Sequence, residues 1–262
     1  MTTPMTTTPT PARFAGKSVL VTGGGTGIGR AVALAFAGEG ASVVVAGRTE
    51  ETLKETVALV EAAGGRAAAV TADVTRGADV AALVEETVRR FGGLHVAVNN
   101  VGVFVPPAPT ADIPEEDWRR ALDTNLTGTF LSMKHEIAHM RAHGGGAIVN
   151  IASNLGASLR RPGISAYVAA KAAVSALTRN AALDHIKDGV RINAVSPGKV
   201  DTSMSTLPGE TAEQKAERMR REVPVGRSAA TAEIAAAVLY LSSDEAAFTV
   251  GAELVVDGGV TA

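Results

Sequence analysis

The chain has 262 residues, of which 46% are hydrophobic and 20% charged, and its formal net charge at pH 7 is −2. This length allows a substantial buried core, whereas the small net charge offers no basic surface for nucleic acid or an anionic membrane. Cysteine is absent, which excludes disulfides and thiolate chemistry and is compatible with a reducing cytoplasm. We therefore expect a cytoplasmic protein that acts on a small molecule, with any redox chemistry supplied by a cofactor.

The first residues of the chain and its apolar runs indicate which part of the chain folds and whether any part spans a membrane. Residues 1–13, MTTPMTTTPTPAR, are rich in Thr and Pro, which predicts a disordered tail. A single folded domain is therefore expected over residues 14–262. The longest apolar run, IAAAVLYL, is less than half of the roughly 20 residues that a membrane-spanning helix needs, so no membrane span is expected.

From Lys17 onward, short β-branched runs alternate with longer Ala-rich helical patterns. In chain order the runs are SVLVT, ASVVVAG, AAAVTADV, LHVAVNN, GAIVNIAS, VRINAVSPG and GAELVVDGG. Helical patterns between them include residues 30–37, 50–63, 80–91 and 169–185. Strands that are apolar on both faces and joined by helices are typical of a parallel sheet covered on both sides. The sequence therefore predicts an α/β fold, with one doubly wound sheet of about seven strands.

Residues 199–226 interrupt this alternation, between the sixth run and the last helical pattern. They contain the charged amphipathic stretch ETAEQKAERMRRE. Long connections of this kind are usually functional or mobile. We expect this segment to form a lid over a ligand site.

Residues 22–29, TGGGTGIG, place five glycines between the first strand and the first helix. Bare backbone there lets a pyrophosphate approach the helix N-terminus, where free N–H groups and the helix dipole favour negative charge. The spacing Gly23-x-x-x-Gly27-x-Gly29 does not match G-x-G-x-x-G in any frame. The motif alone is therefore also compatible with a tight crossing of helix and strand.

The end of the second strand indicates which dinucleotide would bind. Gly47 and Arg48 stand there, and the first acidic residue is Glu50. A carboxylate at this position binds the ribose 2′-hydroxyl of NAD, whereas an arginine accommodates the 2′-phosphate of NADP. Arg48 therefore favours NADP(H), with NAD as the alternative if Arg48 is only a solvated side chain.

Three polar residues follow the fifth run in a pattern that suits proton transfer. Ser153 ends the run, at the edge where open α/β sheets bind ligands. In YVAAK, Tyr167 and Lys171 are four residues apart on a helix and face the same way. A phenol ordinarily has a pKa of about 10, which a neighbouring cation lowers. We expect Ser153 to hold a carbonyl oxygen, Tyr167 to exchange its proton, Lys171 to lower the pKa of Tyr167, and a nicotinamide to transfer hydride.

A second motif belongs to a different class of enzyme. HEIAH, residues 135–139, matches the H-E-x-x-H helix of zinc peptidases, and His143 adds a third histidine. A zinc hydrolase is therefore the remote alternative. The metzincin continuation fails because Ala142 replaces its glycine, and no acidic residue between Glu136 and Asp184 can serve as a third ligand. We expect no metal, and we assign the three histidines to a solvated or interface face of a helix.

Eight ordered motifs between residues 15 and 259 resemble those of the short-chain dehydrogenase/reductase family, of the classical type. They are TGGGTGIG, ADV, NNVG, TNLTGTF, IVNIAS, YVAAK, RINAVSPGKVDT and VVDGG. The resemblance implies a Rossmann fold, a nicotinamide cofactor and a homo-oligomer, either a tetramer or a dimer. It also implies a catalytic set in which Asn125 holds a water of a proton relay and Lys171 also binds the nicotinamide ribose. The set is Asn125, Ser153, Tyr167 and Lys171.

The glycine loop and Arg48, together with the residues that the resemblance implies, make up the expected lining of the cofactor site. They are Gly23, Gly25, Thr26, Gly27, Ile28, Gly29, Arg48, Asp73, Val74, Asn100, Gly102, Tyr167, Lys171, Pro197, Gly198, Val200 and Thr202. One departure concerns the catalytic serine, because its spacing to Tyr167 is one residue longer than is usual in the family. Counting back from Tyr167 would select Asn154, whereas alignment on the IVNIAS strand keeps Ser153.

Together these features predict an NADP(H)-dependent oxidoreductase of a ketone or secondary alcohol. The alternatives are a 3-oxoacyl-thioester (acyl carrier protein) reductase and an NAD-dependent alcohol dehydrogenase. A scaffold that binds dinucleotide without turnover would not need the four catalytic residues. Arg160 and Arg161 would attract an anionic tail if they faced the pocket, but we expect them to be solvated. The expected pocket wall is mostly apolar and consists of Val103, Phe104, Leu155, Gly198, Met204 and Leu207.

Overall fold

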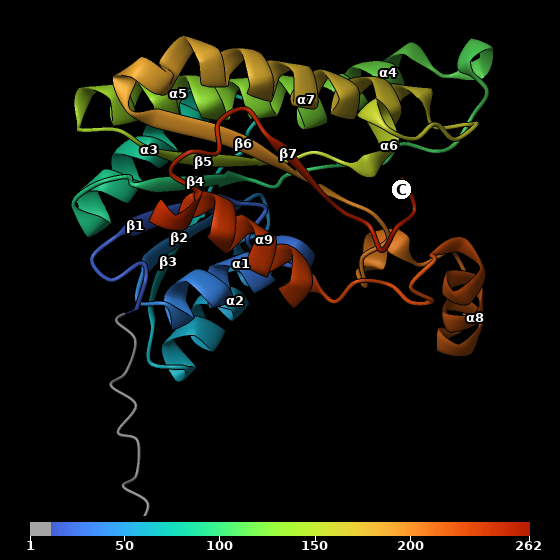
Figure 1. Ribbon diagram of the computed structural model, residues 1–262, viewed down its shortest axis with the longest axis horizontal. Coiled ribbons are helices and arrows are strands. Elements are labelled where there is room, and N and C mark those ends of the chain that lie inside the picture. The colour runs from blue at the N-terminus through green and yellow to red at the C-terminus, as the bar shows by residue number, and fades with distance from the viewer. Residues whose placement is uncertain (1–11) are drawn as a thin grey trace, which may run out of the picture.

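Within residues 12–262, which the computed structural model describes, seven parallel strands form one sheet (Figure 1). Their order across the sheet is β3-β2-β1-β4-β5-β6-β7. Each strand overlaps one of the predicted runs, so the expected doubly wound α/β fold is confirmed. The strands are β1 (Ser18–Thr22), β2 (Ser42–Gly47), β3 (Arg66–Thr71), β4 (Val96–Asn99), β5 (Gly146–Ile151), β6 (Val190–Pro197) and β7 (Glu253–Val256).

Helices cover both faces of this sheet (Figure 1). One face carries α1 (Gly27–Gly38), α2 (Glu50–Ala62) and α9 (Thr231–Ser242). The other carries α3 (Gly77–Phe91), α5 (Gly128–Ala142) and α7 (Ser165–His185). The shorter helices α4 (Glu115–Leu122), α6 (Asn154–Ala157) and α8 (Ala212–Glu222) lie in the connections. Helix α8 belongs to the segment expected to form a lid and stands apart from the helices that pack on the sheet.

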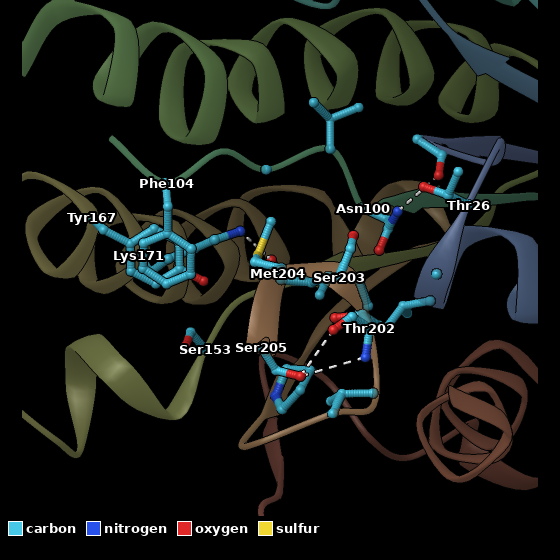
Figure 2. A pocket seen from close by; sticks show the side chains of 18 of the residues that line it. Thr26, Asn100, Phe104, Ser153, Tyr167, Lys171, Thr202, Ser203, Met204 and Ser205 are labelled. Carbon is cyan, nitrogen blue, oxygen red and sulfur yellow. Dashed lines mark hydrogen bonds between the residues drawn. The ribbon is translucent and has the colours of Figure 1, made fainter. Parts of the chain in front are cut away.

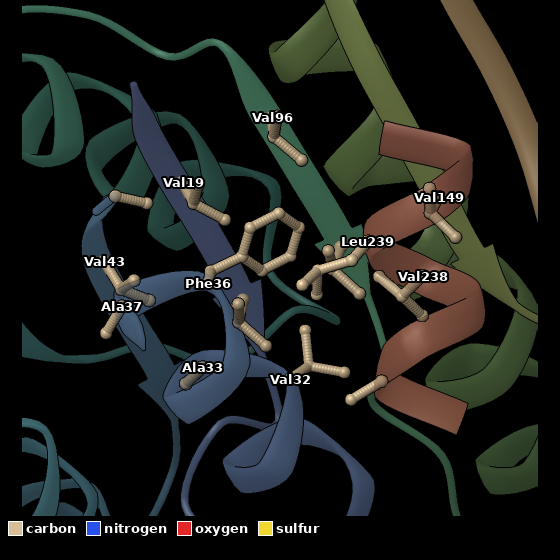
Figure 3. Packing of buried hydrophobic residues seen from close by; sticks show 14 of the residues in the cluster. Val19, Val32, Ala33, Phe36, Ala37, Val43, Val96, Val149, Val238 and Leu239 are labelled. Atoms are coloured by element: carbon tan, nitrogen blue, oxygen red, sulfur yellow. The ribbon is translucent and has the colours of Figure 1, made fainter. Parts of the chain in front are cut away.

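The alternation of side chains along each strand divides the core into two layers. On β1, Val19 belongs to the same buried cluster as Phe36 of α1, whereas the next residue, Leu20, joins Met133 of α5 on the opposite face. Figure 3 shows Phe36 between Val19 and Leu239 of α9. Phe36 is fully buried, and burial of such a side chain contributes about 1.5–3 kcal/mol. This packing holds the loops at the carboxyl edge of the sheet in fixed positions.

The strand order reverses between β1 and β4, which places the loops after these strands around one crevice. Thr22 at the end of β1 lies opposite Asn99 of β4, and Asn99 lies opposite Asn150 of β5. Open parallel sheets bind ligands at such a reversal. The glycine loop and Ser153 directly follow these strand ends, so the topology brings both predicted motifs to the same edge.

The predicted tail, residues 1–13, lies almost wholly outside the described residues. Its last two residues are described, and Arg13 donates a hydrogen bond from Nε to Glu39 over 2.6 Å. Arg13 is therefore held by an ion pair just beyond the end of α1 and is part of the fold. Among the described residues, no helix is both long and apolar enough to cross a bilayer.

The HEIAH motif lies on α5, and its glutamate faces the core. Glu136 is fully buried and accepts a hydrogen bond from Asn99 Nδ2 over 2.9 Å. The rings of His139 and His143 stack on each other, with centroids 4.1 Å apart. In the described part of the chain, no group of three or more His, Cys, Asp or Glu residues is arranged to hold a metal. The zinc alternative therefore lacks its catalytic base, because helical periodicity turns Glu136 into the protein interior.

Burial raises the pKa of Glu136 to about 7, although the hydrogen bond from Asn99 acts to lower it. The carboxyl oxygen Oε1 has no hydrogen-bond partner within residues 12–262, and neither has Asn99 Oδ1. Two unpaired acceptors in the core favour the protonated, neutral form of the acid.

Replacing Glu136 by Gln should make stability less dependent on pH. Because the folded protein keeps Glu136 neutral, the raised pKa of Glu136 contributes its full stabilisation to the fold below the usual pKa of 4.5. This stabilisation should fall by on the order of 3 kcal/mol as the pH rises through about 7. Urea unfolding at about pH 5 and about pH 8 should show this fall for the wild type and for the exposed-site control Glu116→Gln. A fall of the same size in Glu136→Gln would contradict the assignment.

Candidate active site

A cavity of about 810 Å³ opens at the carboxyl edge of the sheet. The loops that follow β1, β2, β3, β4, β5 and β6 all contribute to its lining, and so does the 199–226 segment. Its volume falls in the range of small-molecule and cofactor sites, roughly 300–1,000 Å³. The crevice predicted from the strand order is therefore a formed cavity.

The glycine loop forms one end of this cavity, and its glycines are required by close contacts. A Cβ at Gly23, whose φ is +65°, would lie 2.8 Å from Asn100 Nδ2. A Cβ at Gly29 would collide with the carbonyl oxygen of Gly23. Asn100 Nδ2 donates to the carbonyl oxygens of Thr22 and Gly23, each over 3.2 Å. The loop is thus held tightly against the first turn of α1.

This end of the cavity fits the diphosphate of a dinucleotide. Thr26, the residue before α1, makes no side-chain hydrogen bond to the first turn, so backbone N–H groups there are available to an anion. Gly25 and Gly27 line the cavity with Thr26 and present no side chain that would block the approach. The close packing of the loop on α1 supplies a surface of bare backbone at the helix N-terminus.

Arg48 and Asp73 line the cavity beyond the glycine loop. Arg48 is exposed and makes no hydrogen bond or ion pair with another residue in the range 12–262. Asp73 accepts hydrogen bonds from the backbone N–H and the hydroxyl of Thr75, over 3.0 and 2.8 Å. These bonds, led by the backbone one and assisted by the charge of Arg48, lower the pKa of Asp73. An exposed guanidinium therefore lies at this end of the cavity with no carboxylate hydrogen-bonded to it among residues 12–262.

Ser153, Tyr167 and Lys171 come together on the opposite side of the cavity (Figure 2). All three are buried. The Ser153 hydroxyl lies close enough to Tyr167 to act on the pKa of the phenol, and its oxygen accepts a hydrogen bond from the N–H of Leu155 over 3.1 Å. Asn154, the competing position, instead donates to Asp257 over 3.2 Å. The residue that meets Tyr167 is therefore Ser153, as alignment on the strand indicates.

The pKa of Tyr167 moves in the direction opposite to the one expected from the sequence. Burial raises the pKa of the phenol, and the hydrogen bond with Ser153 only partly offsets this. Burial also lowers the pKa of Lys171 to about 8, and Lys171 Nζ donates to the carbonyl oxygen of Ile151 over 2.7 Å. Desolvation sets the direction of the shift, so Tyr167 is a protonated phenol at neutral pH and can donate a proton.

Phe104 covers one face of Tyr167. The two rings are stacked, with centroids 4.0 Å apart and an interplanar angle of 22° (Figure 2). Phe104 lines the cavity and is itself 36% exposed. Its ring covers one face of the Tyr167 side chain and so adds to the burial that raises the pKa of Tyr167.

Asn125 lies behind the cavity and not on its surface. It sits in a π-helical turn, Asp123–Thr127, and is fully buried. Its amide nitrogen donates to the carbonyl oxygens of Val103 and Ala121, and its oxygen accepts from the N–H of Val103. Both ends of the side chain are therefore occupied, and they fix the backbone next to Gly102. The expected relay role of Asn125 stays a prediction.

Most of the predicted site residues line the cavity together. Among the cofactor residues the exception is Gly29, which is buried in the contact between the loop and α1. Among the pocket-wall residues the exception is Val103, whose backbone is engaged by Asn125. Arg160 and Arg161, expected to be solvated, are exposed but do line the cavity.

Several lining residues carry no recognisable motif. The charged amphipathic stretch at residues 210–222 gave no indication that two of its side chains, those of Arg218 and Glu222, reach the cavity. The residues without a motif include Thr49, Thr52, Leu53, Leu159, Arg218, Glu222 and Val260.

The fold and this site define a dinucleotide-binding oxidoreductase, and comparison with known proteins agrees. A family model described as enoyl-(acyl carrier protein) reductase matches residues 23–261. Cis-4-hydroxycyclohexanecarboxylate dehydrogenase of Sinomonas cyclohexanicum is 43% identical, over 95% of this chain and 98% of that protein. Cyclohexanol dehydrogenase of Acinetobacter sp. strain SE19 is 41% identical, over 95% and 96%.

Similar solved structures belong to the same class of oxidoreductase. Levodione reductase superposes with a TM-score of 0.90 at 34% identity, covering 95% of this chain and 99% of that one. A putative short-chain alcohol dehydrogenase from Sinorhizobium meliloti 1021 superposes with a TM-score of 0.89 at 34% identity, covering 96% and 98%. The chain belongs to the short-chain dehydrogenase/reductase family, of the classical type. It is therefore an oxidoreductase that uses a nicotinamide cofactor.

Gly29→Ala should weaken dinucleotide binding at least tenfold, which corresponds to about 1.4 kcal/mol or more, because the new methyl group would force the Gly23 carbonyl away from α1. Fluorescence titration with NADPH and NADH measures the effect. Gly38, at the other end of the same helix, has open space where a Cβ would stand. Gly38→Ala is the matched control and should bind as the wild type does. Unchanged binding in Gly29→Ala would show that the close contact is not required.

Proposed function

We propose that this chain is an NADP(H)-dependent oxidoreductase that interconverts a ketone and a secondary alcohol, with Tyr167 as general acid and base. The observation that carries the proposal is the buried cluster of Ser153, Tyr167 and Lys171 in one cavity with the glycine loop. Neither feature alone implies this chemistry, since buried tyrosines and glycine-rich turns are common in structural roles. Their presence in one cavity supports a site where a dinucleotide and a carbonyl group meet.

The residues that line the cavity suggest how each part of a dinucleotide would be held. The bare backbone from Gly25 to Ile28 would hold the diphosphate, and Arg48 would bind a 2′-phosphate through a bidentate, charge-assisted contact. Further along the cavity, the adenine would lie by Asp73 and Val74. Asn100, Gly102, Pro197, Gly198, Val200 and Thr202 would face the nicotinamide half, with Lys171 at its ribose. A bound nicotinamide supplies hydride to a carbonyl carbon or accepts it from an alcohol.

The protein's part in the reaction is to orient the oxygen and move one proton. In reduction, the protonated phenol of Tyr167 donates to the carbonyl oxygen, and in oxidation the phenolate takes the proton from the alcohol. The Ser153 hydroxyl holds the same oxygen in place. The buried ammonium of Lys171 stabilises the phenolate left after proton donation. Asn125 supports the site through the backbone of Val103 and, by resemblance to the family, through a water of the relay.

The walls of the cavity support a cyclic, largely apolar substrate. Phe104, Leu155, Leu159, Met204 and Leu207 line the cavity. Two of the relatives reported above are named for cyclohexane-ring alcohols. Reduction of a 3-oxoacyl thioester is the second candidate, because the matching family model is described by acyl carrier protein chemistry. A screen of cyclic ketones against acetoacetyl thioesters distinguishes the two.

The assembly and location of the protein belong to the same proposal. Trp118 on α4 and Phe130 on α5 are 39% and 48% exposed, and apolar side chains of this size on neighbouring helices support a homo-oligomer, a tetramer or a dimer. The cytoplasmic location expected from the absence of cysteine stays a prediction.

Tyr167→Phe should lower kcat/KM for cyclohexanone reduction with NADPH by roughly 10² to 10⁴, the usual contribution of a general acid. NADPH affinity should stay near the wild-type value. The chain contains one other tyrosine, Tyr240, which is 41% exposed on α9. Tyr240→Phe is the matched control and should leave kcat/KM unchanged. Near-normal turnover by Tyr167→Phe would refute the mechanism.

Arg48→Asp should reverse the coenzyme preference. Loss of a charge-assisted contact to the 2′-phosphate costs about 1.5–3 kcal/mol, so NADPH should bind roughly 10 to 150 times more weakly. NADH, which has no such phosphate, should bind at least as well as before. Fluorescence titration with both coenzymes measures this, and tighter binding of NADH by the wild type would assign the protein to NAD.

A further inference from the structure

The end of the cavity beside α8 carries more positive than negative charge. Four cationic side chains line it, from two separate parts of the chain, whereas Glu222 is the only acidic residue among the described lining residues of this end. Ser203 and Met204 of the 199–226 segment line the same cavity as Tyr167 (Figure 2). The four cations are Arg160, Arg161, Lys199 and Arg218.

One of these cations is already neutralised. Arg218 donates from Nε and Nη2 to the carboxylate of Glu210, over 2.6 and 2.7 Å, and also from Nη2 to the carbonyl oxygen of Ser205 over 2.9 Å. The guanidinium lowers the pKa of Glu210 to about 2. Such a bidentate pair is geometrically specific, so Arg218 serves to hold the segment together.

The charge of one carboxylate, that of Glu222, acts on both Lys199 and Arg161. Glu222 Oε2 lies 3.0 Å from Lys199 Nζ and 3.5 Å from Arg218 Nη1. Burial raises the pKa of Glu222, but the hydrogen bond with Lys199 and the charges of Lys199, Arg218 and Arg161 outweigh it and lower that pKa. Glu222 is therefore a stable carboxylate at this position. Its single negative charge does not balance the two positive charges of Lys199 and Arg161.

We propose that this end of the cavity binds a carboxylate of the substrate, with Arg161 and Lys199 as the recognition residues. The inference rests on the proposed function and names its substrate class: a cyclic oxo or hydroxy acid whose carbonyl or hydroxyl group meets Tyr167. The apolar walls at Leu155 and Leu159 exclude water from the ring of such a substrate. A guanidinium and an ammonium at the far end match a carboxylate in charge, and both form charge-assisted hydrogen bonds to carboxylates.

Glu222 opposes the binding of a substrate carboxylate at this end of the cavity. Its carboxylate competes with that of the substrate for Lys199 and Arg161, and it repels an incoming anion. Removing the charge of Glu222 should therefore strengthen binding of a carboxylate, while removing the charge of Arg161 should weaken it. Opposite effects from two neighbouring residues distinguish charge recognition from general damage to the site.

The test compares two probes of nearly equal shape, cyclohexanecarboxylate and the neutral cyclohexanecarboxamide, by calorimetric titration of the protein saturated with NADP⁺. The wild type should bind the carboxylate at least tenfold more tightly, and Arg161→Gln should remove this preference without changing the affinity for the carboxamide. Glu222→Gln should bind the carboxylate more tightly than the wild type does. Arg141→Gln, at an exposed position of α5 outside the cavity lining, is the matched control and should behave as the wild type.

Equal binding of the two probes by the wild type would overturn the proposal, and so would a preference that survives Arg161→Gln or a loss of carboxylate affinity in Glu222→Gln. Binding of neither probe would overturn it as well. Because neither probe can be turned over, these outcomes do not depend on catalysis. Turnover of cyclohexanone, measured separately, decides the proposed function, so failure of one inference is distinguishable from failure of the other.

Discussion

The contact between the first turn of α1 and the end of β1 is the constraint on which the site depends. Gly29 has no Cβ, so the helix can approach the carbonyl oxygen of Gly23, and Asn100 ties that carbonyl to the loop after β4. The helix N-terminus is thereby held at the reversal of strand order, where a diphosphate can meet free N–H groups. The large buried side chains of α1, led by Phe36, hold the helix in this position from the other end.

Desolvation governs the chemistry at the opposite side of the cavity. Tyr167 and Lys171 are both buried, and burial shifts their pKa values toward the neutral forms, upward for the phenol and downward for the ammonium. The stacked ring of Phe104 adds to this effect. A protonated phenol beside a cation of reduced pKa is suited to giving a proton and to tolerating the phenolate that results. The site is therefore arranged by exclusion of water as much as by charge.

Charge is distributed unevenly along the cavity, and the two ends differ in what they can bind. Arg48 stands alone at one end, near an Asp73 already engaged by Thr75. At the other end Lys199 and Arg161 surround Glu222. Apolar side chains line the cavity as well, together with Ser153, Tyr167 and Lys171. This distribution of charge supports the two proposals above, a phosphorylated dinucleotide at one end and a substrate carboxylate at the other.

The sequence by itself determined the parallel α/β sheet, the glycine loop and the pairing of Tyr167 with Lys171, because periodicity and short spacings are local properties that survive into the fold. It also indicated Ser153, whose position follows from the end of a strand. Only the tertiary structure decided that Glu136 faces the core, that the backbone of Val103 hydrogen-bonds to the Asn125 side chain and that Glu222 reaches the cavity. It also decided the sign of the Tyr167 pKa shift. These outcomes depend on contacts between segments far apart in the chain, and on burial, which no local pattern encodes.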